Sequence, residues 1–180
     1  NHRNIIVSNQ AGRSNILSRL EKYGVKINSK DPKVQKILDE VKDREFSGYS
    51  YDGADASFEL LDNRLLGKVP EYLNVKSYNV SVAKSDTIKT KANVVFLIDG
   101  KNIECNGEGN GPVNALDNAI RSNFKKVEKY YNFFSDLKLL DYKVRILNTG
   151  TEATTRVLIE STDKTGISWF TVGVSPNIIE

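Results

Sequence analysis

The feature that most limits the fold of this chain is a pattern that occurs twice after residue 70. Each time, three strand-like segments with alternating or clustered apolar residues are followed by the start of a helical pattern. The first set is YNVSV, ANVVFLI and NIECNGEG, and the second set is DYKVRIL, ATTRVLIES and ISWFTVGV. The pattern predicts an α+β fold with two β-β-β-α units, at about residues 71–135 and 136–180.

The two units correspond at three places in the same order. Their first strands share the alternation Y-x-V-x-V or Y-x-V-x-I, and ANVVFLIDG aligns with ATTRVLIES. The turn GNGP, before the first helix, aligns with GVSP, after which SPNIIE is predicted to begin the second helix. A unit of this size buries little apolar surface alone, so we predict that the two copies pack about a pseudo-two-fold axis.

Before residue 70 the apolar residues recur with a helical period, which predicts three helices. Ser14 is a suitable N-cap for the first helix, in NILSRLEKYG. Asp31 is a suitable cap for the second, with Pro32 at the first helical position. Asp55 is a possible cap for the third, in GADASFELLDNRLLG.

The remaining N-terminal segment, RNIIVS at residues 3–8, is predicted to be extended. We therefore expect residues 1–70 to form a mainly helical linker subdomain and residues 71–180 to form a second domain. The chain contains no methionine and begins with Asn1, so we expect it to be part of a longer protein.

Charge and hydropathy argue against two classes of partner. The 26 basic and 23 acidic residues are mixed along the chain and give a net charge of +3, so no nucleic-acid-binding surface is expected. The longest apolar run, near Val94–Ile98, is far shorter than the roughly 20 residues that span a bilayer.

The chain is also poor in the residues that build many catalytic and metal sites. His2 is its one histidine and Cys105 its one cysteine. The single cysteine excludes an internal disulfide and fits a reducing cytoplasm. A zinc cluster, a Ser-His-Asp triad or a Cys-His pair is hard to assemble from one of each. Catalysis by carboxylates stays open, although solvated surface is the ordinary role of such acidic residues.

The segment GEGNGPVNAL is a glycine-rich turn before a helix that is predicted to begin at Pro112. Gly109 and Gly111 allow backbone angles and close approaches that other residues forbid. The N–H groups of the helix N-terminus then favour an anion. The buried face of this helix is predicted to be Val113, Leu116, Ile120 and Phe124.

The glycine spacing fits neither a dinucleotide-binding fingerprint nor a P-loop, which would need Gly-Lys-Ser/Thr. A small carboxylate therefore suits this turn better than a pyrophosphate. The alternative is a connection that binds nothing.

Several longer motifs resemble one known family. GEGNGPVNAL, DYKVRIL, TRVLIES and VGVSPNIIE together resemble the C-terminal regulatory (leucine-binding dimerisation) domain of the 2-isopropylmalate synthase family. QAGRSNI and GYSYDGADASFELL resemble the helical linker that precedes this domain, especially in the citramalate synthase branch. The resemblance covers nearly the whole chain.

The resemblance implies a parent acyltransferase that condenses acetyl-CoA with a 2-oxo acid in a TIM barrel holding a divalent metal ion. No segment of this chain resembles that barrel, so we expect no catalytic residue, cofactor or metal site here. The chain would contact the barrel, form a homodimer in the cytoplasm, and bind a branched-chain amino acid for feedback inhibition. The effector would be isoleucine in the citramalate synthase branch and leucine in the 2-isopropylmalate synthase branch.

The resemblance also implies the effector-binding residues. They are Gly109, Asn110, Gly111, Pro112, Val113, Asn114, Leu139, Tyr142, Ile146, Ala153 and Thr155. Period 2 places Tyr142 and Ile146 on one face of a strand, which fits a pocket wall and equally fits ordinary core. Many relatives carry an acidic residue, which would pair with the effector's ammonium group, where this chain has Asn114. Asp117 or Asp141 could supply the missing charge.

Two other functions remain open from the residues. One is an unliganded dimerisation module with the same fold. The other is a basic-aromatic nucleic-acid surface, although a solvated helix end followed by core aromatic residues explains the same pattern. The order of the strands also argues against an RNA-recognition fold. The residues of this segment are Lys125, Lys126, Lys129, Tyr130, Tyr131, Phe133 and Phe134.

Overall fold

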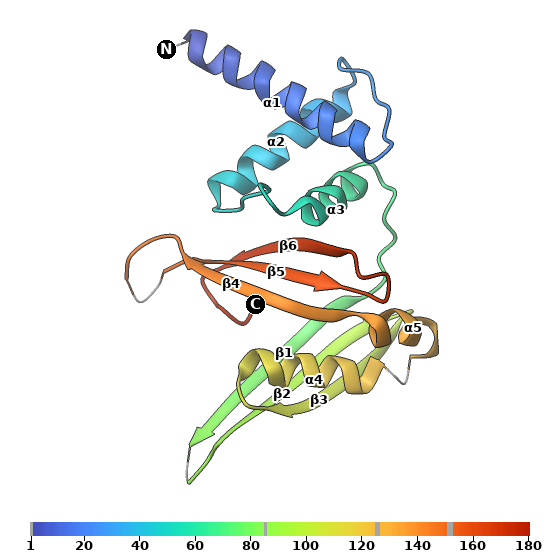
Figure 1. Cartoon of the computed structure of the whole chain (residues 1–180), viewed down its shortest axis with the longest axis vertical. Coiled ribbons are helices and arrows are strands. Elements are labelled where there is room, and N and C mark those ends of the chain that lie inside the picture. The colour runs from blue at the N-terminus through green and yellow to red at the C-terminus, as the bar shows by residue number, and fades with distance from the viewer. Residues whose placement is uncertain (1, 85, 125–126, 151–152) are drawn as a thin grey trace.

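The computed structural model describes residues 2–84, 86–124, 127–150 and 153–180. Its helices are α1 (His2–Lys22), α2 (Pro32–Phe46), α3 (Asp55–Leu65), α4 (Pro112–Phe124) and α5 (Glu128–Asp136). Its strands are β1 (Asn74–Lys84), β2 (Ile88–Ile98), β3 (Lys101–Gly109), β4 (Lys138–Ile146), β5 (Thr155–Thr162) and β6 (Ser168–Ser175). Helices α1–α3 lie at one end, sheet β4–β6 lies in the middle, and sheet β1–β3 with α4 lies at the other end (Figure 1).

Both predicted sets of three strands form antiparallel sheets, in the orders β1-β2-β3 and β4-β5-β6. The β2–β3 hairpin turns at Asp99 and Gly100, whose φ angles of 48° and 76° are both positive. Two consecutive positive φ angles are the requirement of a type I′ hairpin turn, which is why the Asp-Gly pair predicts it. The α+β class with two β-β-β units is therefore confirmed, while the pseudo-two-fold axis stays a prediction.

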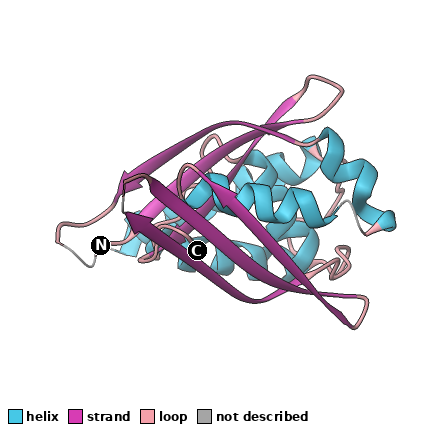
Figure 2. Ribbon diagram, turned by 90° about the horizontal axis from the view of Figure 1, so that it is seen from below, coloured by secondary structure: helices cyan, strands magenta, loops and turns pink. Residues whose placement is uncertain are grey.

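Sheet β1–β3 buries one face under α4. Side chains of β2 alternate between buried and exposed positions, and Val94, Phe96 and Ile98 point into this core. Phe124 from the end of α4 meets Phe96 edge-on, at a ring-centroid distance of 5.3 Å. Seen from below, none of the described helices lies in front of the other face of this sheet (Figure 2).

Sheet β4–β6 contacts the helices α1–α3 through the face that points away from α4. The N–H of Val172 on β6 donates to Oγ of Ser57 on α3 at 2.9 Å. Nη1 of Arg156 on β5 donates to the carbonyl of Gly48, after α2, at 3.2 Å. Val172 also packs against the apolar core formed by α1, α2 and α3. Sheet β4–β6 therefore lies between the helices α1–α3 on one side and α4 on the other.

One of the two caps predicted for α2 and α3 is confirmed, and the other is wrong. Asp31 caps α2 as expected, because its Oδ1 accepts from the N–H of Lys33 at 2.8 Å and Pro32 follows as the first helical residue. Asp55 is instead the first residue of α3, and Ala54 occupies the cap position. Asp55 reaches Lys22 Nζ at 3.1 Å, so its carboxylate joins α3 to α1.

Helix α1 contradicts two predictions. Residues 3–8 are helical instead of extended, and Ser14 lies inside the helix instead of capping it. β-Branched residues each cost a helix no more than about 0.7 kcal/mol, so a short run of them does not end it. Gly12 does not end it either, because its missing side chain lets α1 approach α2. A Cβ at Gly12 would lie 3.1 Å from Cδ1 of Leu38.

The C-terminal segment also differs from its prediction. Residues 176–180 form a turn and no helix. The side-chain oxygen of Asn177 accepts from the N–H of Ile179 at 3.1 Å, and its carbonyl accepts from the N–H of Glu180 at 3.0 Å. An Asn side chain that bonds the backbone two residues later stabilises a turn in competition with a helix.

Candidate functional site

The glycine-rich turn is shaped by the contact between α4 and β3. A Cβ at Gly107 would lie 2.3 Å from the backbone N of Ala119, and one at Gly109 would lie 2.6 Å from the N of Ala115. At Gly111 no atom lies within 4 Å of that position. Gly109 is therefore needed for close approach, as predicted, whereas Gly111 is not. Neither of the two has a positive φ, so neither uses the backbone angles that glycine allows.

The helix that follows begins at Pro112, as predicted. Asn114 belongs to its first turn, and its Oδ1 accepts from the N–H of Asn110 at 3.1 Å. Nδ2 of Asn118 donates to the carbonyl of Glu108 at 2.9 Å. The two asparagines therefore fix the turn against the helix, and the oxygen of Asn114 is already used within the protein.

Helix α4 uses two different faces, which corrects its predicted core. The face against its own sheet is formed by the fully buried residues Ala115, Ala119 and Phe124. Of the predicted buried face, Phe124 is fully buried there, and Leu116 and Ile120 pack against the same core as partly buried residues. Val113 is 37% exposed, and the half-buried Leu116 and Ile120 also line a cavity between α4 and sheet β4–β6. Small residues form the centre of this contact because the helix is close to the sheet, and the larger Leu116 and Ile120 pack at its margin.

Two cavities lie between α4 and sheet β4–β6. The first, of about 480 Å³, extends to Arg121 and the start of β4. The second, of about 570 Å³, extends along β5 to the C-terminal turn. We call the two together the α4–β4 cleft, because the residues that line both are Val113, Asp117, Leu139 and Tyr142.

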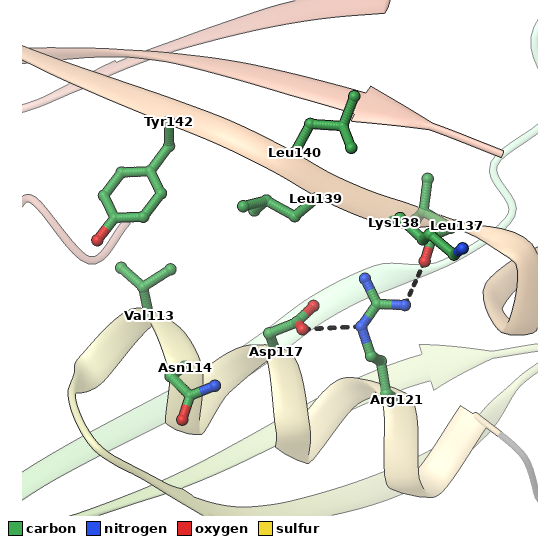
Figure 3. A pocket seen from close by; sticks show the side chains of 9 residues that line it. All are labelled: Val113, Asn114, Asp117, Arg121, Leu137, Lys138, Leu139, Leu140 and Tyr142. Atoms are coloured by element: carbon green, nitrogen blue, oxygen red, sulfur yellow. Dashed lines mark hydrogen bonds and ion pairs between the residues drawn. The ribbon is translucent and has the colours of Figure 1, made fainter. Parts of the chain in front are cut away.

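The first cavity combines apolar side chains with one ion pair. Val113 at the start of α4 lies opposite Tyr142 and Leu139 of β4, as Figure 3 shows. Asp117 and Arg121 follow along the helix, and Arg121 Nε donates to Asp117 Oδ2 at 2.7 Å. Nη1 of Arg121 also donates to the carbonyl of Leu137, just before β4. This ion pair therefore joins α4 to the beginning of β4.

The second cavity is lined by the inner face of sheet β4–β6. Thr155, Val157 and Ile159 of β5 point into it. Oγ1 of Thr155 donates to the carbonyl of Ser175 at 2.9 Å. The far wall is the C-terminal turn, where Oε2 of Glu180 accepts from Oγ of Ser175 at 2.7 Å. The walls are mostly apolar, with carboxylates at two points.

The structure brings together about half of the expected effector-binding residues. Val113, Asn114, Leu139, Tyr142 and Thr155 line one or both cavities. The turn Gly109–Pro112 adjoins the cleft without lining it, and Ala153 lies outside both cavities. Ile146 also lies outside them and is 66% exposed.

Sequence reasoning missed the contributions of Leu116, Ile120, Val157 and Ile159 to the cleft. The helical spacing of large apolar residues on α4 predicts core, and Leu116 and Ile120 both pack against that core and line the cleft. Of the two acidic candidates near the ligand, Asp117 lies in the cleft. Asp141 lies instead 3.7 Å from Lys143 Nζ and does not line either cavity.

The aromatic residues after α4 are partly core. Phe134 packs on Phe124 at a ring-centroid distance of 4.2 Å, and the hydroxyl of buried Tyr130 donates to the carbonyl of Tyr72. Tyr131 is exposed. Lys125 and Lys126 lie outside the described residues, as do the side chains of Lys129 and Phe133. The described aromatic residues thus favour the structural explanation of this segment.

No group of three or more His, Cys, Asp or Glu side chains among the described residues could hold a metal ion. None of the described helices is long and apolar enough to cross a membrane.

Comparison with known proteins shows which family the chain resembles. Residues 52–180 match the family model of the LeuA allosteric (dimerisation) domain. The chain is 44% identical over 185 residues to an (R)-citramalate synthase of Aquifex aeolicus, covering 100% of the chain and 34% of that relative. It is 45% identical over 181 residues to an (R)-citramalate synthase of Geobacter sulfurreducens, covering 98% of the chain and 34% of the relative.

A more distant relative carries a different name. A 2-isopropylmalate synthase of Burkholderia multivorans is 28% identical over 182 residues, covering 97% of the chain and 32% of the relative. The chain thus spans about a third of the length of the curated relatives that it matches. The glycine-rich turn, both sheets and every residue that lines the cleft except Tyr49 lie within the matched residues. The chain belongs to the LeuA allosteric (dimerisation) domain family.

Proposed function

We propose that this chain is the regulatory and dimerising part of a citramalate synthase, and that its α4–β4 cleft binds isoleucine as a feedback inhibitor. The observation that carries the proposal is the make-up of the cleft. Apolar side chains of Val113, Leu139 and Tyr142 lie there beside the carboxylate of Asp117 and the N-terminus of α4. An α-amino acid with an aliphatic side chain has the complementary groups.

The energies suit a metabolite-sized ligand. Burial of an aliphatic side chain against the apolar walls contributes about 1.5–3 kcal/mol. A carboxylate at the N-terminus of α4 gains about 0.3–2 kcal/mol from the helix dipole, in addition to its hydrogen bonds. Isoleucine and leucine differ only in shape, which an apolar pocket distinguishes by about 1–3 kcal/mol.

The choice of isoleucine follows from the relatives. Six relatives named citramalate synthase are 29–45% identical to the chain, four of them at 41–45%, whereas two relatives named 2-isopropylmalate synthase are 28% identical. We therefore propose that the parent chain condenses acetyl-CoA with a 2-oxo acid, using a divalent metal ion, in a TIM barrel outside the matched third. Residues 1–70 would act as the helical linker to that barrel and residues 71–180 as the regulatory domain.

The direct test is thermal unfolding of the chain with millimolar isoleucine, leucine or valine. A ligand that binds only the folded state must raise the unfolding temperature. We expect isoleucine to raise it most. A larger effect of leucine would favour the 2-isopropylmalate synthase branch, and no effect of any of the three would contradict the proposal.

A matched pair of variants locates the site. At Gly111 there is open space for a side chain, so both Gly111→Asp and Gly111→Asn should fold. The aspartate places a negative charge beside the N-terminus of α4, where the ligand's carboxylate would lie, and should abolish the effect of isoleucine. The asparagine has the same size without the charge and should keep more of the response. Equal responses from both variants would argue against an anion at this turn.

A further inference from the structure

The ion pair in the cleft suggests how the positive charge of the ligand is bound. We infer that Asp117 receives the α-ammonium group of the amino acid that occupies the α4–β4 cleft. The inference rests on the proposed function and goes further, because it assigns the recognition of the ammonium group to one residue outside the glycine-rich turn.

The position of Asp117 is the first argument. It is one of the four residues that line both cavities, and the other three are Val113, Leu139 and Tyr142. Among these four it alone has a carboxyl group. An ammonium group that leaves water for an apolar cleft needs a carboxylate or several acceptors. Of the four residues that line both cavities, Asp117 is the one that offers a carboxylate to the ammonium group.

The orientation of the carboxylate is the second argument. Its Oδ2 is bound by Nε of Arg121 at 2.7 Å. Its other oxygen points toward Leu139 of β4 (Figure 3). Within the described part of the chain, Asp117 makes no further hydrogen bond or ion pair. One oxygen is therefore held by the protein, and the other is directed at the space that a ligand would fill.

The spacing along α4 is the third argument. Val113 and Asp117 are four residues apart, so they lie on the same side of the helix about one turn, or 5.4 Å, apart. An α-amino acid carries its carboxylate and ammonium groups on the same carbon atom. One molecule can thus direct its carboxylate to the helix N-terminus, its ammonium group to Asp117 and its side chain to Leu139 and Tyr142.

The other candidates serve less well. Asn114 has no charge, and its Oδ1 accepts from the N–H of Asn110. Asp141 is 3.7 Å from Lys143 and lines neither cavity. Glu180 lines only the second cavity and accepts from Oγ of Ser175.

The test compares two ligands that differ only in the charged group. L-Isoleucine and 2-hydroxy-3-methylpentanoate share the side chain and the carboxylate, but the second has a hydroxyl in place of the ammonium group. Isothermal titration of the 180-residue chain should show at least about tenfold tighter binding of isoleucine, as expected for a charge-assisted hydrogen bond. Asp117→Asn should remove this preference by weakening isoleucine about tenfold or more, with little effect on the hydroxy acid.

The control is Asp141→Asn, which removes a carboxylate outside the cleft and should leave both affinities unchanged. Asp117→Asn should fold, because a partly exposed ion pair contributes little to stability. Asp117→Ser, which also removes the charge, should give the same loss of preference.

The outcomes separate the two hypotheses. If the wild-type chain binds neither ligand, the proposed function is wrong and the inference falls with it. If the wild-type chain prefers isoleucine and Asp117→Asn keeps the same preference, the proposed function stands and the role of Asp117 is overturned.

Discussion

Asp62 is a carboxyl group in the interior of the helical part of the molecule. It lies on α3, is 2% exposed, and neither of its oxygens has a hydrogen-bond partner in the described structure. Burial raises its pKa from 3.8 to about 7, and Glu59 adds to the rise, while Arg19 opposes it. The folded chain thus holds a proton on Asp62 at pH values at which the unfolded chain has lost it.

This proton makes stability depend on pH. Because the pKa is raised in the folded state, protonated Asp62 adds to the free energy of unfolding. This contribution is complete below about pH 3.8 and is lost as the pH rises through about 7. A difference of about three pKa units corresponds to roughly 4 kcal/mol as an upper limit. We expect the free energy of unfolding of the wild type to fall over this interval.

Asp62→Asn removes the titrating group with almost no change in size. Its free energy of unfolding, measured by urea denaturation, should lose most of the fall between about pH 4 and pH 7 that the wild type shows. Asp52→Asn is the control, because the side chain of Asp52 is 95% exposed. If the difference between Asp62→Asn and the wild type is the same at every pH, Asp62 does not titrate as described.

At the scale of elements, the contact between α4 and β3 depends on a missing side chain. Gly107→Ala would place a Cβ 2.3 Å from the backbone N of Ala119 and 2.7 Å from the carbonyl oxygen of Ala115. Backbone atoms of a helix cannot move aside singly, so α4 must shift. We expect a loss of about 1–3 kcal/mol in the free energy of unfolding, measured by chemical denaturation.

Gly111→Ala provides the comparison for this prediction. It makes the same chemical change in the same turn, but no atom lies within 4 Å of the new Cβ. Its effect should stay within about 0.5 kcal/mol of zero. Equal losses in the two variants would show that the tight contact at Gly107 is not what limits substitution.

Local rules explain which elements were predictable from sequence. The six strands, the Asp99-Gly100 turn and the cap of α2 depend on residues close together in the chain. The close approach at Gly12 of α1 and the buried face of α4 depend on neighbours distant in the sequence. Gly12 is tolerated because of Leu38, and Ala115 replaces larger residues in the core because α4 lies so close to Gly107.

The residues of the cleft also divide into those that could be named from the sequence and those that could not. Val113, Leu139 and Tyr142 were named from the family resemblance, and the structure places them around one space. The relation of Asp117 to Leu139 could not be derived from periodicity, because it requires α4 and β4 to face each other. That arrangement is a property of the folded chain.

At the scale of the whole molecule, both sheets carry exposed apolar side chains. Val82 and Ile88 belong to the β1–β2 hairpin, and Val144 and Ile146 belong to β4. Exposed apolar patches of this kind mark interaction surfaces, and the family is named for dimerisation. We expect light scattering at micromolar concentration to give about twice 20.2 kDa.

A variant on β4 tests which surface forms the dimer. Ile146→Lys places a charge on this exposed apolar face and should shift the chain toward the monomer without unfolding it. Lys143→Ala, on the opposite face of the same strand, should leave the mass unchanged. A monomeric wild type would refute the dimer, and a dimeric Ile146→Lys variant would exclude this face of β4 from the interface.

The two sheets share no strand pairing in the described residues, so each keeps its own hydrogen bonds whatever the separation between them. The space between α4 and β4 can therefore widen or narrow without breaking a ladder. Sheet β4–β6 is attached to α3 through Val172 and Ser57, and to the end of α2 through Arg156 and Gly48. We expect any molecule that changes the gap to tilt this sheet as a rigid plate and to carry the N-terminal helices with it.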